Sequence, residues 1–122
     1  MSTPNNRALA EATAAGTVLQ LTMVILGHWA PVIASLFAVL GMAISLVAGA
    51  LYARMARPGI GQGAVGGAVA GGVCALIGIA VSFALGDVPA VVLAFGTVSS
   101  AVTGAIGGAA VAALTRRPAT NS

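Results

Sequence analysis

Residues 58–86 read PGIGQGAVGGAVAGGVCALIGIAVSFALG, a run of 29 residues without a formal charge, bounded by Arg57 and Asp87. A helix rises about 1.5 Å per residue and the hydrocarbon core of a bilayer is about 30 Å thick, so about 20 such residues span it. Two further uncharged runs, residues 12–53 and 88–115, contain 42 and 28 residues. The longer of these runs has room for two spans. The sequence therefore predicts four transmembrane helices.

The composition of the chain excludes a water-soluble fold. Hydrophobic residues make up 59% of the 122 residues and charged residues only 6%, whereas about a quarter of a typical soluble domain is charged. We predict an all-α, membrane-embedded four-helix bundle of two helical hairpins. It forms a single transmembrane domain over residues 1–122, with short cytoplasmic tails at residues 1–7 and 115–122. The predicted spans are residues 8–27, 32–53, 63–86 and 90–114.

The two predicted hairpins share the same turn chemistry. The first long run breaks at GHWAP, residues 27–31, because glycine tolerates left-handed backbone and proline starts a helix better than it continues one. The sequence GDVP, residues 86–89, repeats this turn in the second half of the chain. The helix after each turn ends in Arg-Pro, at residues 57–58 and 117–118. Either an ancient duplication or convergent turn chemistry accounts for the repetition.

The arginines predict how the chain is threaded. Short loops rich in arginine stay on the cytoplasmic side of a membrane. We therefore predict that both termini and the loop around residues 54–62 are cytoplasmic, in a bacterial inner membrane. The turns with His28 and Asp87 then share the outer side, where a His-Asp pair could respond to pH because imidazole titrates near neutrality. Trp29 and Tyr52 lie near opposite ends of the first hairpin, where amphipathic rings favour the membrane interface.

Small residues at four-residue spacing form ridges on three of the predicted helices. Positions i and i+4 share one helix face, so such ridges let helix backbones approach closely in lipid. Three uses of these ridges remain open from the sequence: packing within one chain, contact between copies in a homo-oligomer, and contact with another membrane protein. The predicted packing residues are Gly41, Ser45, Gly49, Gly63, Gly67, Gly71, Gly78, Gly96, Gly104 and Gly108.

Two polar residues are candidates for transport chemistry. Gln20 lies near the middle of the first predicted span, where its amide needs a partner, and an interhelical hydrogen bond is the structural interpretation. Glu11 is the second candidate, because a carboxyl group in a low-dielectric site can exchange a proton for a cation. Arg7 lies one helical turn before Glu11, and the alternative for Glu11 is therefore an interfacial salt bridge.

The sequence Leu9-Ala10-Glu11, followed by Gly16-Thr17, resembles the first helix of the small multidrug resistance transporters. These are four-span proteins of similar length, and the resemblance implies an acidic residue that binds protons and cationic drugs at Glu11. The chain departs from that family in its polar residues 1–7, which place Glu11 near the interface. A second stretch, from Gly49 to Gly78, is similar to small bacterial four-helix membrane proteins of unknown function, and this likeness implies only the fold.

The chain offers little for catalysis or cofactor binding. Residues 61–66 match the pattern G-x-G-x-x-G, but a dinucleotide site needs a preceding strand, and these residues follow a predicted helix end. With one histidine, one cysteine and two carboxylates, we expect no catalytic, metal or cofactor site and no enzyme activity. The basic residues lie at span ends without interleaved aromatics, so we expect no nucleic-acid partner.

The sequence therefore favours a non-enzymatic small integral membrane protein. We expect a packing or assembly component that acts through glycine-zipper contacts between helices, with the lipid bilayer and either a second copy or another membrane protein as partners. The alternative is a small four-span transporter or pore for a cation or small molecule, with Glu11 and Gln20 as its polar site.

Overall fold

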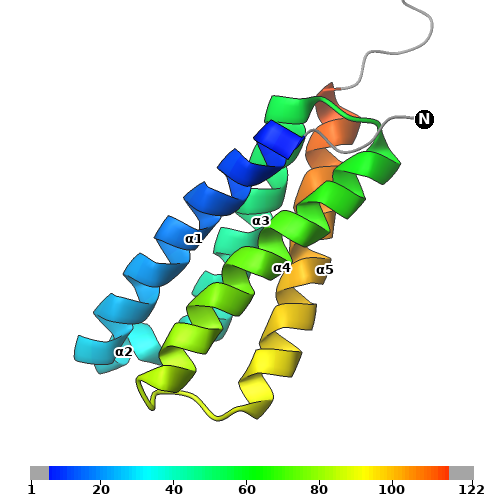
Figure 1. Ribbon diagram of the computed structural model, residues 1–122. Helices are drawn as coiled ribbons and strands as arrows, with labels where there is room; N and C mark the ends of the chain where they lie inside the picture. The colour runs from blue at the N-terminus through cyan, green and yellow to red at the C-terminus, as the bar shows by residue number, and fades with distance from the viewer. Residues whose placement is uncertain (1–5, 116–122) are drawn as a thin grey trace, which may run out of the picture.

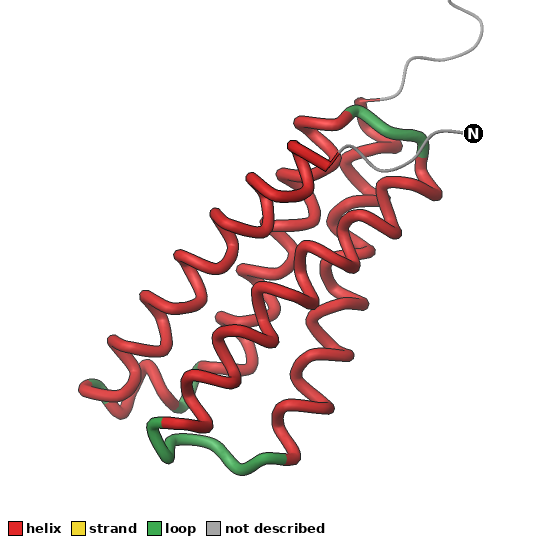
Figure 2. The backbone as a smooth tube through the Cα atoms, in the orientation of Figure 1, coloured by secondary structure: helices red, strands yellow, loops and turns green. Residues whose placement is uncertain are grey.

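Four long helices run up and down in the computed structural model, which describes residues 6–115 (Figure 1). Each is long and apolar enough to cross a membrane. Loops and turns occur only at the two ends of the bundle (Figure 2). The predicted all-α four-helix bundle is confirmed, and the chain is a small integral membrane protein. In order, the helices are α1 (Asn6–Trp29), the short α2 (Pro31–Ala34), α3 (Phe37–Ala56), α4 (Ile60–Ala84) and α5 (Val91–Thr115).

Helices α3 and α4 form the centre of the bundle. They pack against each other, and both also contact α1 and α5, which lie on opposite sides of this pair (Figure 1). The start of α1 and the end of α3 lie at the same end of the bundle. This end therefore holds Arg7, Arg54 and Arg57, as the charge pattern predicted, while Arg116 and Arg117 lie outside the described residues.

The second predicted span, residues 32–53, was wrong at both of its ends. Residues 31–34 form the separate helix α2, and α3 continues to Ala56. Pro31 starts α2, and the Ser35 hydroxyl donates a hydrogen bond to the Val32 carbonyl at 2.8 Å. Leu36 then leaves helical geometry, with φ −105° and ψ 9°. The Ser35 hydroxyl thus bonds back to the preceding turn at the break, but Thr22 and Thr103 do the same inside continuous helices, so this bond alone does not explain it.

Backbone-to-backbone contact joins α4 to α5 and to α3. A side-chain carbon added at Gly67 would collide with the Gly104 carbonyl, and one added at Gly104 would collide with the Gly67 carbonyl. Gly49 on α3 also faces the Gly104 carbonyl. Lipid gives no hydrophobic drive between helices, so close dispersion contact and weak Cα–H···O bonds must hold them together. These three glycines allow that approach.

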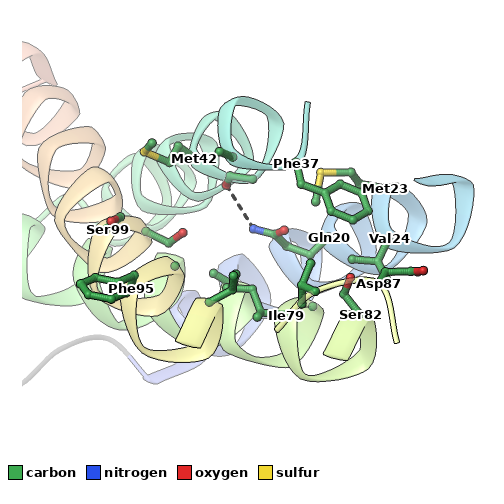
Figure 3. Close-up of a pocket in the computed structure, with 18 of the residues that line it drawn as sticks. Gln20, Met23, Val24, Phe37, Met42, Ile79, Ser82, Asp87, Phe95 and Ser99 are labelled. Carbon is green, nitrogen blue, oxygen red and sulfur yellow. Dashed lines mark hydrogen bonds between the residues drawn. The ribbon is translucent and has the colours of Figure 1, made fainter. Parts of the chain in front are cut away.

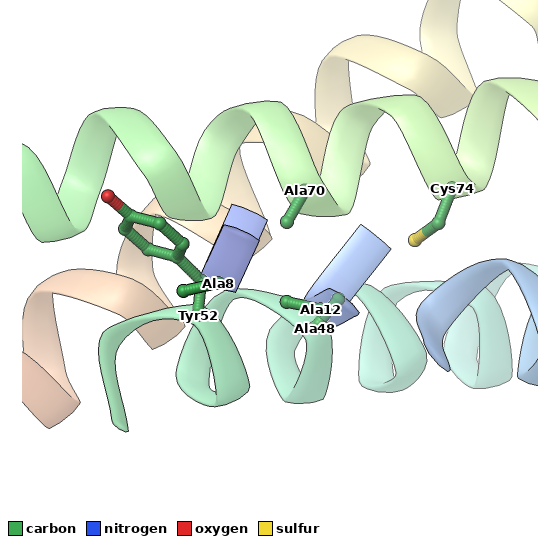
Figure 4. Close-up of a cluster of buried hydrophobic side chains, with 6 residues drawn as sticks. All are labelled: Ala8, Ala12, Ala48, Tyr52, Ala70 and Cys74. Carbon is green, nitrogen blue, oxygen red and sulfur yellow. The ribbon is translucent and has the colours of Figure 1, made fainter. Parts of the chain in front are cut away.

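A cluster of small buried residues joins α1, α3 and α4 on the other side of α4 (Figure 4). Tyr52 is its one large member and is fully buried, with its ring against Gly66. Tyr52, predicted to lie near the membrane interface, is thus covered by protein, whereas Trp29 is 80% exposed. The ring fits because Gly66 has no side chain. The cluster consists of Ala8, Ala12, Ala48, Tyr52, Ala70 and Cys74.

Replacing Gly104 by alanine should destabilise the bundle, because the new methyl group would meet the Gly67 carbonyl. We expect a loss of about 1–3 kcal/mol in the free energy of unfolding, typical of overpacking. Gly41→Ala is the matched control, since its methyl group would lie 3.8 Å from Gln20 Oε1, an ordinary contact. Titration with a denaturing detergent, followed by circular dichroism, measures both. Equal midpoints for the two variants would contradict this account of the packing.

The orientation predicted from the arginines can be tested with single cysteines, because Cys74 is the only native cysteine and is buried. In a Cys74→Ala background, Gly59→Cys lies between α3 and α4 and Ala90→Cys lies between α4 and α5. A membrane-impermeant maleimide added to spheroplasts should label Ala90→Cys and should label Gly59→Cys only after lysis. The reverse pattern would show that the termini are outside.

Candidate functional site

Gln20 is the polar centre of the bundle. It lies on α1 with 2% of its surface exposed. Its Nε2 donates hydrogen bonds to the Gly41 carbonyl at 3.2 Å and to Ser45 Oγ at 3.4 Å, both on α3. A carbonyl oxygen can only accept, so the nitrogen of the amide must face Gly41. The interhelical hydrogen bond predicted for Gln20 is therefore confirmed.

The network continues from Gln20 and Ser45 to α4. Ser45 Oγ donates to the Gly71 carbonyl at 3.2 Å, and Cys74 Sγ donates to the same carbonyl at 3.3 Å. Cys74 Sγ also accepts from Gln20 Nε2 at 3.9 Å. Side chains from three helices thus share hydrogen bonds in a region where lipid supplies no other partner. The network fixes α1 against the α3 and α4 pair.

The other end of the amide, Gln20 Oε1, is left open. It accepts no hydrogen bond from the residues between 6 and 115. Gly41 and Gly78 flank the side chain. A carbon added at Gly78 would collide with Gln20 Cβ at 2.9 Å, whereas one added at Gly41 would lie 3.8 Å from Gln20 Oε1. Space beside the amide oxygen therefore lies on the Gly41 side. An unpaired acceptor in an apolar surrounding favours any molecule that can donate a hydrogen bond.

A cavity of about 480 Å³ lies beside Gln20, in the half of the bundle nearer the α4–α5 turn (Figure 3). All four long helices contribute to its lining. Its apolar walls include Met23, Val24, Phe37, Met42, Ile79 and Phe95. Its polar lining residues are Gln20, Ser35, Ser82, Asp87, Ser99 and Ser100.

Ser82 adds a second unpaired group to this lining. Its residue surface is 2% exposed, and its buried hydroxyl has no hydrogen-bond partner among the described residues. Ser100, from α5, is 4% exposed and lines the same cavity. Buried polar groups are normally paired, so the unpaired oxygen of Gln20 beside the cavity indicates room for a polar part of a ligand, whereas the Ser82 hydroxyl is covered by its neighbours.

Asp87 is held beside the cavity by the end of α4. The Gly86 amide donates to the Phe83 carbonyl at 2.9 Å, and the Asp87 amide donates to the Ser82 carbonyl at 3.0 Å. These two bonds form a Schellman motif, which needs left-handed backbone at Gly86, where φ is +80°. Asp87 Oδ2 lies 2.8 Å from His28 Nδ1 at the end of α1. The sequence placed His28 and Asp87 in turns on the same side of the membrane, and their contact in the structure joins the two hairpins.

Glu11 lies far from this cavity, in the second turn of α1 at the opposite end of the bundle. Its carboxylate pairs with Arg7 Nε at 3.0 Å, and the two side chains are 52% and 89% exposed. The structure therefore forms the salt bridge and does not bring Glu11 to Gln20. An exposed pair of this kind contributes little to stability.

The ten predicted packing residues have three kinds of surroundings in the structure. Six glycines lie where a side-chain carbon would meet the backbone of another helix within 3.0 Å, namely Gly49, Gly63, Gly67, Gly71, Gly104 and Gly108. Three others line the cavity, namely Gly41, Gly78 and Gly96, while Ser45 belongs to the Gln20 network. Sequence reasoning missed Gly107, which faces the Leu46 carbonyl, because it lies off the four-residue ridge.

Sequence reasoning also missed the cavity and the part that Ser82 and Asp87 play in it. Their only signals were the polarity of Ser82 in an apolar span and the place of Asp87 directly after Gly86. Among residues 6–115, no three histidine, cysteine or acidic side chains lie close enough to hold a metal ion. Comparison with protein-family models, curated proteins and solved structures gave no match.

Replacing Gln20 by leucine should weaken the bundle only moderately. The loss of its bonds to α3 should lower the free energy of unfolding by about 0.5–2 kcal/mol, the range measured for interhelical hydrogen bonds in membranes. Thr22→Val is the control on the same helix, since the Thr22 hydroxyl bonds only to the Val18 carbonyl of its own helix. Detergent unfolding should leave Thr22→Val close to the wild type. A larger loss for Thr22→Val than for Gln20→Leu would contradict the role of the network.

Proposed function

We propose that this small integral membrane protein binds a small, largely apolar molecule in the cavity beside Gln20. The observation that supports this function is a cavity of about 480 Å³ next to an unpaired amide oxygen. Ligand sites are typically cavities of about 300–1,000 Å³ with mostly apolar walls and a few polar groups that orient the ligand. The cavity beside Gln20 has this size and this mixture of side chains.

The distribution of glycine supports a cavity that belongs to the fold. In α4, the glycines Gly63, Gly67 and Gly71 contact α5 closely, whereas Ile79 takes the place opposite Gly96. The larger side chain holds the helices apart on the side where the cavity lies. A site built between rigidly packed helices keeps its shape, which lowers the entropic cost of binding.

The proposal favours the transporter class over the assembly class that the sequence suggested first. An assembly role through glycine ridges needs ridges that another protein can reach. At the six glycines that face a neighbouring backbone, the helix surface is already covered by other helices of the same chain. An assembly surface would therefore have to use another face of the bundle, such as the α5 face with Phe95, Val98 and Val102, which are 71%, 64% and 55% exposed. In a bilayer that face is also the natural surface for lipid.

The arginine pattern predicts which side of the membrane the proposed site is on. With the termini in the cytoplasm of a bacterial cell, the cavity lies in the outer half of the inner membrane. Binding there is the first step of a small four-span transporter, or the whole activity of a carrier or sensor. Both roles require the same saturable binding, so binding is the property to measure.

Phenylbutanol is a suitable first probe, because it combines an apolar body with one hydroxyl donor. Its addition to the purified protein in detergent should raise the melting temperature in a saturable way, as a ligand of the native state does. Gly41→Leu should abolish this shift, because the new side chain fills the cavity next to Gln20. Gly59→Leu is the matched control, since Gly59 has open space around it and does not line the cavity.

Circular dichroism should first show that both leucine variants are folded. An equal shift of the melting temperature in Gly41→Leu and Gly59→Leu would locate the binding elsewhere. The proposed function would then fail.

A further inference from the structure

The cavity carries a single negative charge. Asp87 is the only one of its described lining residues with a formal charge. The described arginines, Arg7, Arg54 and Arg57, lie at the other end of the bundle. A carboxylate beside low-dielectric walls produces a stronger field than the same group in water. The field at this cavity therefore favours a cation and disfavours an anion.

Backbone hydrogen bonds fix the position of Asp87, and only one of its two carboxylate oxygens has a hydrogen-bond partner among the described residues. Its backbone is held by the Schellman motif at the end of α4, and its side chain is 23% exposed. His28 Nδ1 contacts only Oδ2, and Oδ1 has no hydrogen-bond partner among the described residues. His28 is also the only titratable side chain that faces Asp87 within residues 6–115. One oxygen of the carboxylate is thus unpaired, at the edge of the cavity (Figure 3).

The interior of the cavity offers a second acceptor. The donors of the Gln20 amide are used by Gly41, Ser45 and Cys74, which leaves its oxygen free to accept. The hydroxyls of Ser82 and Ser100 can accept as well as donate. No lysine, arginine or histidine lines the described cavity. A ligand that fits these groups carries hydrogen-bond donors and a positive charge on an apolar body.

We propose that the cavity selects protonated amines with an apolar body, and that Asp87 is the residue that recognises their charge. The ammonium group donates to Asp87 Oδ1, and the apolar body lies against Met23, Val24 and Phe37, which line the cavity on the same side (Figure 3). This inference rests on the proposed function, because it names the class of ligand for the same cavity. It differs from the sequence-based expectation, which placed cation recognition at Glu11.

The test uses three probes with one skeleton: phenylbutylamine, phenylbutanol and phenylbutyrate. At neutral pH the first is a cation, the second is neutral and the third is an anion. Calorimetry with the full chain in phosphatidylcholine nanodiscs, corrected with empty nanodiscs, gives each dissociation constant. We expect the ammonium to bind at least about fivefold more tightly than the alcohol, and the carboxylate to bind more weakly than the alcohol.

Asp87→Asn should remove the preference for the ammonium over the alcohol. Its side-chain oxygen can still accept a hydrogen bond from His28, so the link between the hairpins is retained. Glu11→Gln is the matched control, because Glu11 is the only other carboxylate side chain of the chain and lies at the opposite end. It should keep the full preference.

Each outcome decides between the two proposals. If the alcohol binds in a way that Gly41→Leu abolishes, but the wild type shows no preference for the ammonium, the assignment of Asp87 is wrong and the proposed function stands. The same conclusion follows if Asp87→Asn keeps the preference. If none of the three probes binds saturably, both proposals fail. A wild type without the preference overturns the assignment of Asp87 whether or not Asp87→Asn folds.

Discussion

The contact between the backbones of α4 and α5 is the constraint on which the rest of the structure depends. Gly67 and Gly104 approach so closely that neither position has room for a side-chain carbon. In lipid this closeness replaces the hydrophobic effect as the source of helix association. Helix α4 carries six of its seven glycines in residues 60–72, so the contact is tightest towards the arginine end. The gradient of residue size along α4 produces one packed half and one half with a cavity.

The Gln20 network links α1 to α3 and α4 by polar contacts, which glycine contacts cannot provide. The Gln20 amide on α1 donates to Ser45 on α3, and the Ser45 hydroxyl donates in turn to the Gly71 carbonyl on α4. Without this link, α1 would rely on contacts among small residues such as Ala12 and Ala48. A hydrogen bond in a medium without water is directional, so it sets the rotation of α1 about its axis. That rotation brings Gln20 to the cavity and His28 to Asp87.

The sequence predicted what depends on local properties. Span number and helical class follow from the length and polarity of uncharged runs, and the glycine ridges follow from helical periodicity. The break before Phe37 was missed because residues 32–36, VIASL, contain no glycine or proline that would indicate a turn. The burial of Tyr52 depends on Gly66 from another helix. The cavity was missed for the same reason, because it arises where residues such as Ile79 and Gly96 meet across helices.

The two ends of the Gln20 amide have separate tasks, and this separation makes a stable binding site possible. Its nitrogen holds the bundle together through Gly41 and Ser45, while its oxygen remains unpaired. A ligand that donates to the oxygen therefore does not compete with the bonds that position α1. The two oxygens of Asp87 differ in the same way, since Oδ2 contacts His28 and Oδ1 has no hydrogen-bond partner among the described residues. In both residues the atom that maintains the fold differs from the atom offered to the ligand, so binding can occur without unpacking the helices.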